Sequence, residues 1–214
     1  MTFPGRDLGE LSAAVERGDI ASATVLTGAA INDGVEAGAI LSALMLAMDR
    51  VGERFQHNQI FVPEMLVAAR AMKEAMASVE PLLIDAGIRP EHTAVIGTIK
   101  GDLHDIGKNL VAMMWKGANI NVVDLGTDVS PQRFVAAVAE HDARIVGISA
   151  LLTTTMVGMR AAVDAVHGAY DSGRVSVVVG GAPLTAEFAA AIGADAFAPD
   201  AGSAVEVVKG LLAR

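Results

Sequence analysis

Apolar residues recur at intervals of three and four from Leu8 to about Gly87, which is the period of α-helices that bury one face. We predict four helices there, because no segment has the pattern of a strand. Their sequences are LGELSAAVERG, DIASATVLTGAAINDG, VEAGAILSALMLAMDRVGERFQ and PEMLVAARAMKEAMASVEPLLIDAG. Helices this short are marginal alone in water, so we expect their apolar faces to pack together as a bundle.

Turn-forming residues separate these helical segments, and each break has a chemical cause. Gly18 ends the first segment and Asp19 caps the second. Asp33 and Gly34 form a turn, and Pro63 sets the backbone angle that the first turn of the fourth helix requires. These breaks place the helix boundaries.

The pattern changes between residues 88 and 93, where short apolar, partly β-branched runs begin to alternate with helical ones. We predict strands at Ala94–Ile99, Ile120–Leu125, Ile145–Ser149, Val175–Val179 and Asp195–Ala198, each followed by a helix. Near-continuous apolar strands are buried on both faces, as in a parallel sheet. We therefore predict a helical cap bundle over residues 1–88. Residues 89–214 should form a flavodoxin-like (Rossmann-type) α/β domain with a five-stranded parallel sheet.

Composition narrows the classes of function. The net charge of −9 is spread over both halves without acidic or basic blocks, which argues against nucleic-acid binding. No apolar stretch is long enough to span a membrane and no secretory leader opens the sequence, so we expect a cytoplasmic protein. The chain has no cysteine, which excludes disulfides, iron–sulfur clusters and thiol nucleophiles. A metal must therefore meet His, Asp, Glu or a ligand that a cofactor brings.

The segment GDLHDIGKNL, residues 101–110, follows the first predicted strand, at the edge where such sheets bind ligands. Asp102 and His104 can share a hydrogen bond that fixes the imidazole tautomer and leaves the other nitrogen as a metal ligand or base. Gly107 permits close approach of a bulky ligand. The competing interpretation is a solvated histidine beside a capping aspartate. We interpret the other histidines as ordinary: His57, His92, His141 and His167.

Two further strand ends carry small or polar residues. Ser149 and residues 153–155, all threonine, follow the third strand, and a glycine pair follows the fourth. A glycine pair alone more often serves a tight turn. The combination resembles the cobalamin-binding signature of the base-off, His-on class, whose elements here are Asp102-x-His104-x-x-Gly107, Ser149-x-Leu151 and Gly180-Gly181. Residues Leu8 to Gly87 resemble the helical cap of the small corrinoid proteins that serve methyltransferases, including VGERFQHNQIFVPEMLVAARAM, residues 51–72.

The resemblance implies a role for each motif residue. His104 would be the lower ligand of cobalt and Asp102 would orient it. In the methionine synthase relatives, a hydroxyl six residues after the motif serine extends the hydrogen-bonded relay that runs from the histidine to the aspartate. That position is Thr155 here. A slot for the displaced nucleotide tail would also form at these strand ends. The remaining cofactor-binding residues that it implies are Asp105, Ile106, Gly107, Ser149, Leu151, Thr153, Gly180 and Gly181.

The helical cap would cover the opposite face of the corrin, where the methyl group is carried. Phe61 and Met65, at the start of the fourth helix, are the candidate lid residues, although Met65 is equally expected as plain bundle core. Relatives often have glycine where this chain has Asn58. Asparagine also tolerates a left-handed turn, so we expect the lid to begin in the same way.

The resemblance implies a methyl carrier that is not catalytic alone. It would bind cobalamin, as methylcobalamin, hydroxocobalamin or a related corrinoid, and serve a substrate:corrinoid methyltransferase, a corrinoid:acceptor methyltransferase and a reductive activator. The main alternative is a cobalamin-dependent sensor, which the position of Trp115 outside the bundle and the lack of a basic DNA-binding segment disfavour. A mutase small subunit would lack the full bundle. A receiver-like module would leave the Asp102/His104 pair unexplained. The sequence does not identify the methyl donor.

Overall fold

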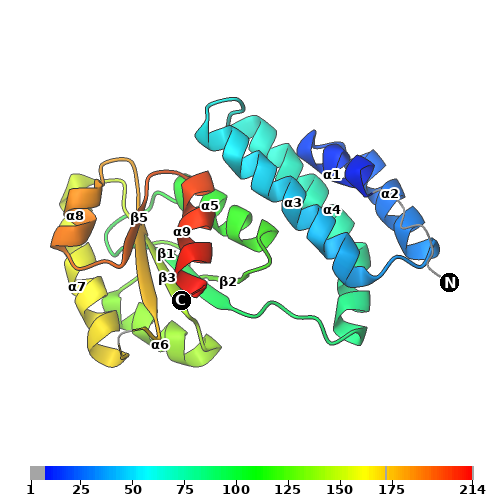
Figure 1. Cartoon of the computed structure of the whole chain (residues 1–214). Coiled ribbons are helices and arrows are strands. Elements are labelled where there is room, and N and C mark those ends of the chain that lie inside the picture. The colour runs from blue at the N-terminus through cyan, green and yellow to red at the C-terminus, as the bar shows by residue number, and fades with distance from the viewer. Residues whose placement is uncertain (1–7, 172, 214) are drawn as a thin grey trace. The chain divides into compact units, whose positions relative to one another are not determined.

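The computed structural model describes residues 8–171 and 173–213, and these fall into two compact units. One unit extends to Pro90 and includes residues 117–119. The other comprises residues 91–116 and the chain from Ile120 onward. The division at residue 90 lies two residues beyond the predicted boundary. Figure 1 colours the first unit blue to cyan-green and the second from green to red.

Helices make up the regular structure of the first unit as far as it is described. They are α1 (Gly9–Glu16), α2 (Ile20–Asn32), α3 (Ala37–Gln56) and α4 (Val62–Asp85). Helix α4 packs against α2 and α3, and α1 packs against both α2 and α3. The predicted bundle is therefore present, with Leu11, Leu44 and Met48 among its fully buried side chains.

The predicted breaks between these helices act as their chemistry requires. The Asp19 carboxylate accepts from the backbone N–H of Ser22 at 3.0 Å and so caps α2. At the start of α4, the Glu64 carboxylate accepts from the backbone N–H of Phe61 at 3.1 Å. Asn58 follows the end of α3 with a left-handed φ of 55°, as expected for asparagine in place of glycine.

The second unit is a parallel sheet with the order β2-β1-β3-β4-β5, which is flavodoxin-like. Its strands are β1 (Thr93–Thr98), β2 (Asn121–Asp124), β3 (Ile145–Ser149), β4 (Ser176–Gly180) and β5 (Ala196–Ala198). Its helices are α5 (Ile106–Gly117), α6 (Pro131–His141), α7 (Thr153–Ala169), α8 (Ala186–Ala191) and α9 (Ala201–Leu212). The predicted fold class is confirmed, and the predicted strand ends differ by at most one residue.

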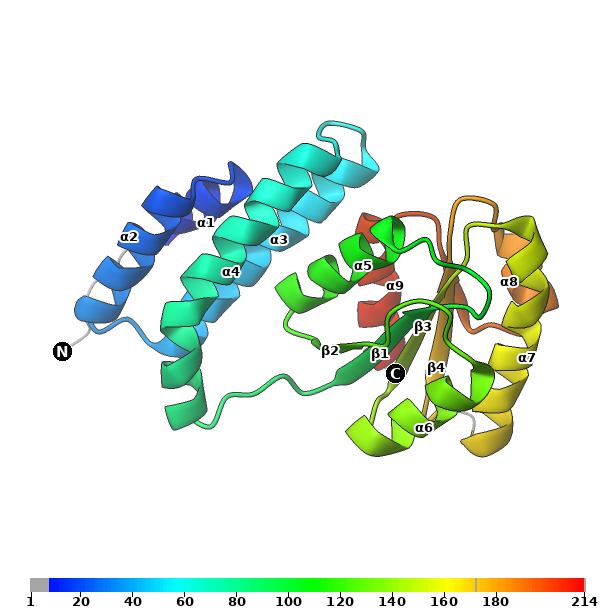
Figure 2. The same cartoon turned by 180° about the vertical axis from the view of Figure 1, so that it is seen from behind.

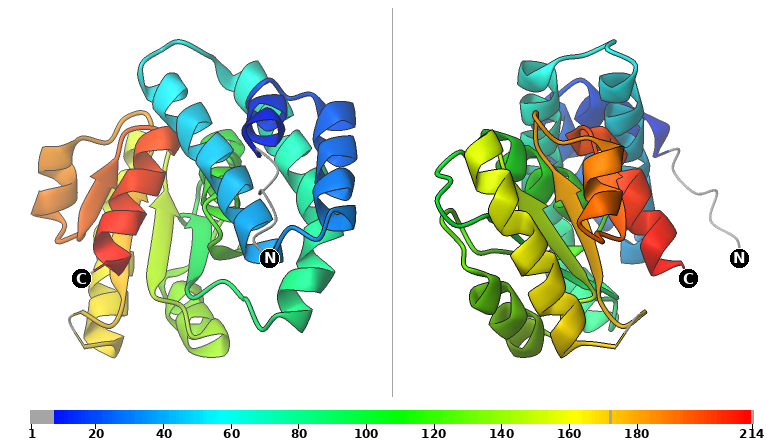
Figure 3. Two further views of the ribbon diagram at one scale, coloured as in Figure 1. Left: turned by 45° about the vertical axis from the view of Figure 1, so that its right-hand side comes forward. Right: turned by 90° about the vertical axis from the view of Figure 1, so that its left-hand side faces the viewer.

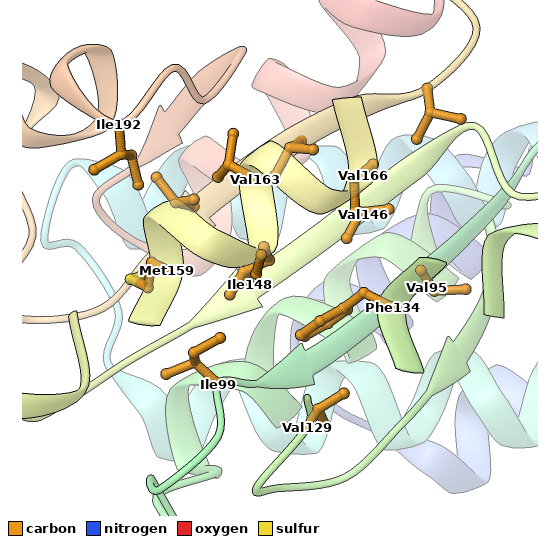
Figure 4. Close-up of a cluster of buried hydrophobic side chains, with 14 of the residues drawn as sticks. Val95, Ile99, Val129, Phe134, Val146, Ile148, Met159, Val163, Val166 and Ile192 are labelled. Carbon is orange, nitrogen blue, oxygen red and sulfur yellow. The ribbon is translucent and has the colours of Figure 1, made fainter. Parts of the chain in front are cut away.

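Helices cover both faces of this sheet, which explains why its strands are apolar on both sides (Figure 2). On one face, Phe134 of α6 and Met159 and Val163 of α7 pack on Val95 and Ile148 of the sheet, as Figure 4 shows. Figure 3 shows the sheet lying between yellow α7 and red α9.

Tight packing on the sheet accounts for two glycines within strands. A Cβ at Gly97 would come within 2.9 Å of the Val129 side chain, and one at Gly147 within 2.8 Å of the Trp115 ring. Trp115 also links two helices, because its indole N–H donates to the carbonyl of Ala204 in α9 at 3.0 Å. The sheet is therefore a rigid platform for the loops at its carboxyl edge.

Candidate functional site

The carboxyl edge of the sheet brings together the three parts of the sequence signature. Thr98, Ser149 and Gly180 lie side by side in register as the last or near-last residues of β1, β3 and β4. The loops that follow these strands carry the remaining signature residues. Segments that are about 50 and 80 residues apart in sequence therefore meet at one edge.

The loop from β1 to α5 is held by several hydrogen bonds. Gly101 has a left-handed φ of 86°, a conformation that glycine adopts without strain. The backbone N–H of Asp102 donates to the carbonyl of Ile99 at 3.1 Å. The buried Thr98 hydroxyl donates to the carbonyl of His104 at 2.9 Å. His104 is therefore presented at a fixed place beyond the end of β1.

Asp102 is fully buried, and its carboxylate is surrounded by donors. Oδ1 accepts from the backbone N–H of His104 at 3.1 Å and from its Nδ1 at 2.8 Å. Oδ2 accepts from the backbone N–H groups of Leu151 and Leu152, at 2.8 and 3.2 Å, and from the Thr155 hydroxyl at 2.8 Å. A buried carboxylate needs such partners, because burial disfavours an isolated charge. Asp102 thereby ties the β1–α5 loop to the β3–α7 loop.

These hydrogen bonds set the charge of the site. Burial alone raises the pKa of the Asp102 carboxyl. The hydrogen bonds from Leu151, His104 and Thr155 outweigh burial and hold that pKa well below its usual range. The ionised carboxylate only accepts hydrogen bonds, so Nδ1 of His104 is the donor of this bond, and in the neutral imidazole Nε2 then has the lone pair. The imidazole side chain is 52% exposed. This is the arrangement of a metal-ligating histidine.

Thr155 extends the His104–Asp102 pair as the resemblance predicted. Its hydroxyl lies 2.8 Å from Asp102 Oδ2 and also 2.8 Å from the carbonyl of Leu152. A hydroxyl has a single proton, so Thr155 donates to one of these acceptors at a time. The Thr155 hydroxyl can therefore donate its proton either to the Asp102 carboxylate or to the carbonyl of Leu152.

Exposed apolar side chains surround the histidine. Leu103 and Ile106 are 73% and 76% exposed, and Leu151 and Leu152 are each about two-fifths exposed. Exposed large apolar residues that gather in one place mark a surface which binds something apolar. Gly107, on the first turn of α5, has open space where a Cβ would lie. The edge around His104 therefore suits a large, flat and partly apolar ligand.

The residues around His104 suit a corrinoid, the cofactor that the sequence resemblance implies. Among the described residues, no group of three or more His, Cys, Asp or Glu side chains could hold a metal ion. A single exposed imidazole fits a metal whose other ligands come from a macrocycle, and the apolar rim fits the ring itself. The residues present therefore fit the cofactor, and His104 is the side chain that would meet the metal.

The glycine pair after β4 has a backbone reason to be glycine. Gly181 has a φ of 139°, and a Cβ there would lie 1.9 Å from the carbonyl oxygen of Ala150. A Cβ at Gly180 would lie 2.9 Å from the carbonyl oxygen of Ala198. Both glycine positions therefore exclude side chains before any ligand is present. The tail slot stays a prediction, and these glycines do not by themselves support it.

The other predicted cofactor residues lie at the same edge. Asp105 accepts from the side-chain amide of Asn109 at 3.1 Å and is partly exposed. Ser149 is the half-buried last residue of β3, and Thr153 is the exposed first residue of α7. Their roles toward a cofactor stay predictions.

The two lid candidates differ in exposure. Phe61, just before α4, is 64% exposed, which is high for a large aromatic side chain. Met65, on the first turn of α4, is fully buried, as a core residue is. Phe61 is therefore the better candidate for a contact with a ligand or partner, and its lid role stays a prediction.

Sequence reasoning missed several ionisable groups near the site and at the opposite edge. The nearly buried Lys108 reaches the Asp124 carboxylate at 2.5 Å, which fastens α5 to the end of β2. At the amino edge of the sheet, His167 Nε2 lies 2.9 Å from the Asp195 carboxylate, which also accepts from the backbone N–H of Val177. His167 is thus paired, although its sequence neighbourhood gave no signal, because its partner is 28 residues away.

Comparisons with known proteins agree with this geometry. Residues 92–209 match the family described as the B12 binding domain, and residues 8–80 match a second B12 binding domain family. The chain belongs to the cobalamin-binding corrinoid proteins. A corrinoid protein of Desulfitobacterium hafniense (strain Y51) is 34% identical over 211 residues, covering 97% of this chain and 98% of the relative.

Further corrinoid proteins cover most of the chain. The dimethylamine corrinoid protein of Methanosarcina barkeri is 37% identical over 175 residues, which is 81% of this chain and 82% of that one. The fold matches a chain of the methanol:cobalamin methyltransferase complex of Methanosarcina barkeri with a TM-score of 0.83 and 26% identity, covering 99% of this chain and 81% of that one. In the part of this corrinoid protein that is described, no helix is both long and apolar enough to cross a bilayer.

Proposed function

We propose that this protein is a corrinoid methyl carrier that holds cobalamin through His104. The observation that carries the proposal is the buried Asp102 carboxylate, which fixes the proton on Nδ1 of His104 and leaves Nε2 free among exposed apolar residues. Reduced cobalt in the bound corrinoid would supply the nucleophile that takes a methyl group from a donor and passes it to an acceptor.

The residues of the chain would control ligation and proton position. Metal binding and protonation use the same lone pair on Nε2 of His104, so each excludes the other. The carboxylate that accepts from Nδ1 would strengthen Nε2 as a metal ligand, and Thr155 would tune this effect by donating or withholding one hydrogen bond to the carboxylate.

Separate methyltransferases would be the partners of this carrier. The relatives include dimethylamine and trimethylamine corrinoid proteins and a chain of a methanol:cobalamin methyltransferase complex. We propose a substrate:corrinoid methyltransferase, a corrinoid:acceptor methyltransferase and a reductive activator as partners, in the cytoplasm. These relatives carry different donor names, so the donor would be set by the partner enzyme. A sensor function has no supporting observation here.

The test is the electron paramagnetic resonance spectrum of the full chain loaded with cob(II)alamin. With ¹⁵N-histidine in the protein, the cobalt signal should show the hyperfine splitting of one ¹⁵N nucleus. His104→Ala should abolish that splitting, and His167→Ala, which removes a histidine paired with Asp195 at the opposite edge of the sheet, should leave it unchanged. A wild type without protein-nitrogen splitting, or a His104→Ala variant that retains it, would refute the proposal.

A further inference from the structure

The loop between β2 and α6 contains an aspartate in an unusual conformation. Asp128 has a left-handed φ of 58°, which is disfavoured for residues with a Cβ. The other non-glycine residues with positive φ in the described chain are Asn58, Asn119 and Asp142, and each follows the end of a helix. Asp128 instead follows a strand, so helix termination does not explain its conformation.

Asp128 holds the histidine loop at two points. Its carboxylate accepts from the backbone N–H of Gly101 at 2.7 Å, and its own N–H donates to the carbonyl of Asp102 at 3.1 Å. The bonded groups flank residues 101 and 102, so a single residue fixes the backbone on both sides of the buried aspartate. We refer to these two hydrogen bonds as the Asp128 clamp.

Neighbouring backbone bonds fix the position of the clamp itself. The N–H of Thr98 donates to the carbonyl of Gly126, and the N–H of Val129 donates to the carbonyl of Thr98, each at 2.9 Å. Ile99 and Val129 also form an isolated parallel bridge. The β2–α6 loop therefore continues the sheet beyond the end of β1, and Asp128 projects from this extension onto the loop that carries His104.

We propose that Asp128 is a positioning residue for the lower ligand, an inference that rests on the proposed function. The side chain of Asp102 is held by the β3–α7 loop, and its backbone is held by the Asp128 clamp. His104 in turn forms two hydrogen bonds to the Asp102 carboxylate, through its backbone N–H and its Nδ1. Releasing the clamp would let residues 101–104 shift, and the imidazole would then meet the metal less often.

Three variants of the full chain distinguish a positioning role of Asp128 from a role only in forming the turn. Asp128→Gly removes the carboxylate and keeps the left-handed backbone easily accessible. Asp128→Asn keeps an acceptor oxygen and also tolerates this backbone. Asp142→Gly is the matched control, because Asp142 is another left-handed aspartate of the same unit, 90% exposed in its side chain at the end of α6.

The readout is the ratio of imidazole-ligated to unligated cobalt in the protein loaded with cob(II)alamin, measured from the ¹⁵N-histidine hyperfine splitting. Loss of one hydrogen bond should lower that ratio by about fivefold in Asp128→Gly. Asp128→Asn should restore it, and Asp142→Gly should leave it at the wild-type value. In the protein without cofactor, amide hydrogen exchange at residues 101–104 should quicken in Asp128→Gly alone.

Two outcomes would overturn the inference. An unchanged ligation ratio in Asp128→Gly would show that the clamp does not position the ligand. An Asp128→Asn variant as impaired as Asp128→Gly would show that the acceptor oxygen is not the cause. A failure of the proposed function is distinguishable from both, because the wild type itself would then lack the nitrogen splitting.

Discussion

Replacing Asp102 with asparagine should reverse the tautomer of His104. An amide has one acceptor oxygen and one NH₂ group, whereas the carboxylate accepts with both oxygens. Oδ2 faces three donors, two of them backbone N–H groups, and Oδ1 faces only the two donors of His104. The amide oxygen should therefore occupy the Oδ2 position and turn its NH₂ toward the imidazole. Nδ1 must then accept, which places the hydrogen on Nε2.

The change of tautomer should weaken both ligation and the fold. A protonated Nε2 has no lone pair for cobalt, so ligation should fall by the ~10–100-fold that is typical when the partner of a metal-binding histidine is lost. That range corresponds to about 1.4–2.8 kcal/mol. The backbone N–H of His104 would also face the NH₂ group and lose its acceptor, which should lower the free energy of unfolding by about 1–3 kcal/mol.

Nuclear magnetic resonance of the ¹⁵N-histidine protein without cofactor reports which ring nitrogen of His104 carries the hydrogen. Electron paramagnetic resonance of the protein loaded with cob(II)alamin reports whether His104 binds the cobalt. Asp195→Asn is the matched control, because Asp195 also accepts from a histidine and a backbone N–H, at the opposite edge of the sheet. It should leave ligation unchanged. An Asp102→Asn variant with its hydrogen still on Nδ1 and wild-type ligation would refute the reasoning.

The pH dependence of stability provides a second test of the Asp102→Asn substitution. The pKa of Asp102 is lowered in the folded protein, so its contribution to stability is complete above the pKa of an unfolded aspartate, about 3.9, and is lost as the pH falls toward the lower folded value. The stability difference between wild type and Asp102→Asn should therefore shrink as the pH falls below 4, as measured by denaturant unfolding.

Three other regions of the chain yield simple tests. Thr27→Val should raise the free energy of unfolding by about 1 kcal/mol, because the Thr27 hydroxyl is fully buried and has no partner among the described residues; denaturant unfolding measures this, and Thr24→Val, at an exposed threonine, should give no gain. Gly107→Ala should leave the fold intact and weaken cobalamin binding in a titration, whereas Gly181→Ala should lower the melting temperature and reduce cobalamin and cobinamide binding alike. Phe61→Ala should speed photolysis of the methylated protein without weakening corrinoid binding; unchanged photolysis would remove Phe61 as a lid.

Much of the fold was predictable, because burial on both faces leaves a direct trace in the sequence. The strands of a sheet covered by helices on each side are apolar at nearly every position, so their existence and order followed from the pattern. Their ends were less predictable. The apolar run extends the predicted first strand to Ile99, but this residue pairs with Val129 only through an isolated bridge beyond β1.

The sequence predicted only those parts of the candidate site that are formed by side chains. The Asp102–His104 pair followed from a spacing of two residues, and Thr155 followed from its place in the motif. The hydrogen bonds from the backbone N–H groups of Leu151 and Leu152 could not be predicted from the sequence, because every residue except proline has such a group. Asp128 was missed because its conformation, rather than its identity, brings it to the loop.

The use of main-chain donors also bears on how the site can evolve. Two of the three groups that bind Asp102 Oδ2 are the amides of residues 151 and 152, whose side chains are partly exposed on the apolar rim. Mutations there can reshape the surface offered to different corrinoids or partner enzymes while the support of His104 is inherited unchanged. Proline is the exception, since it has no N–H to donate. Natural variation at these two positions should therefore be broad in size and polarity and should exclude proline.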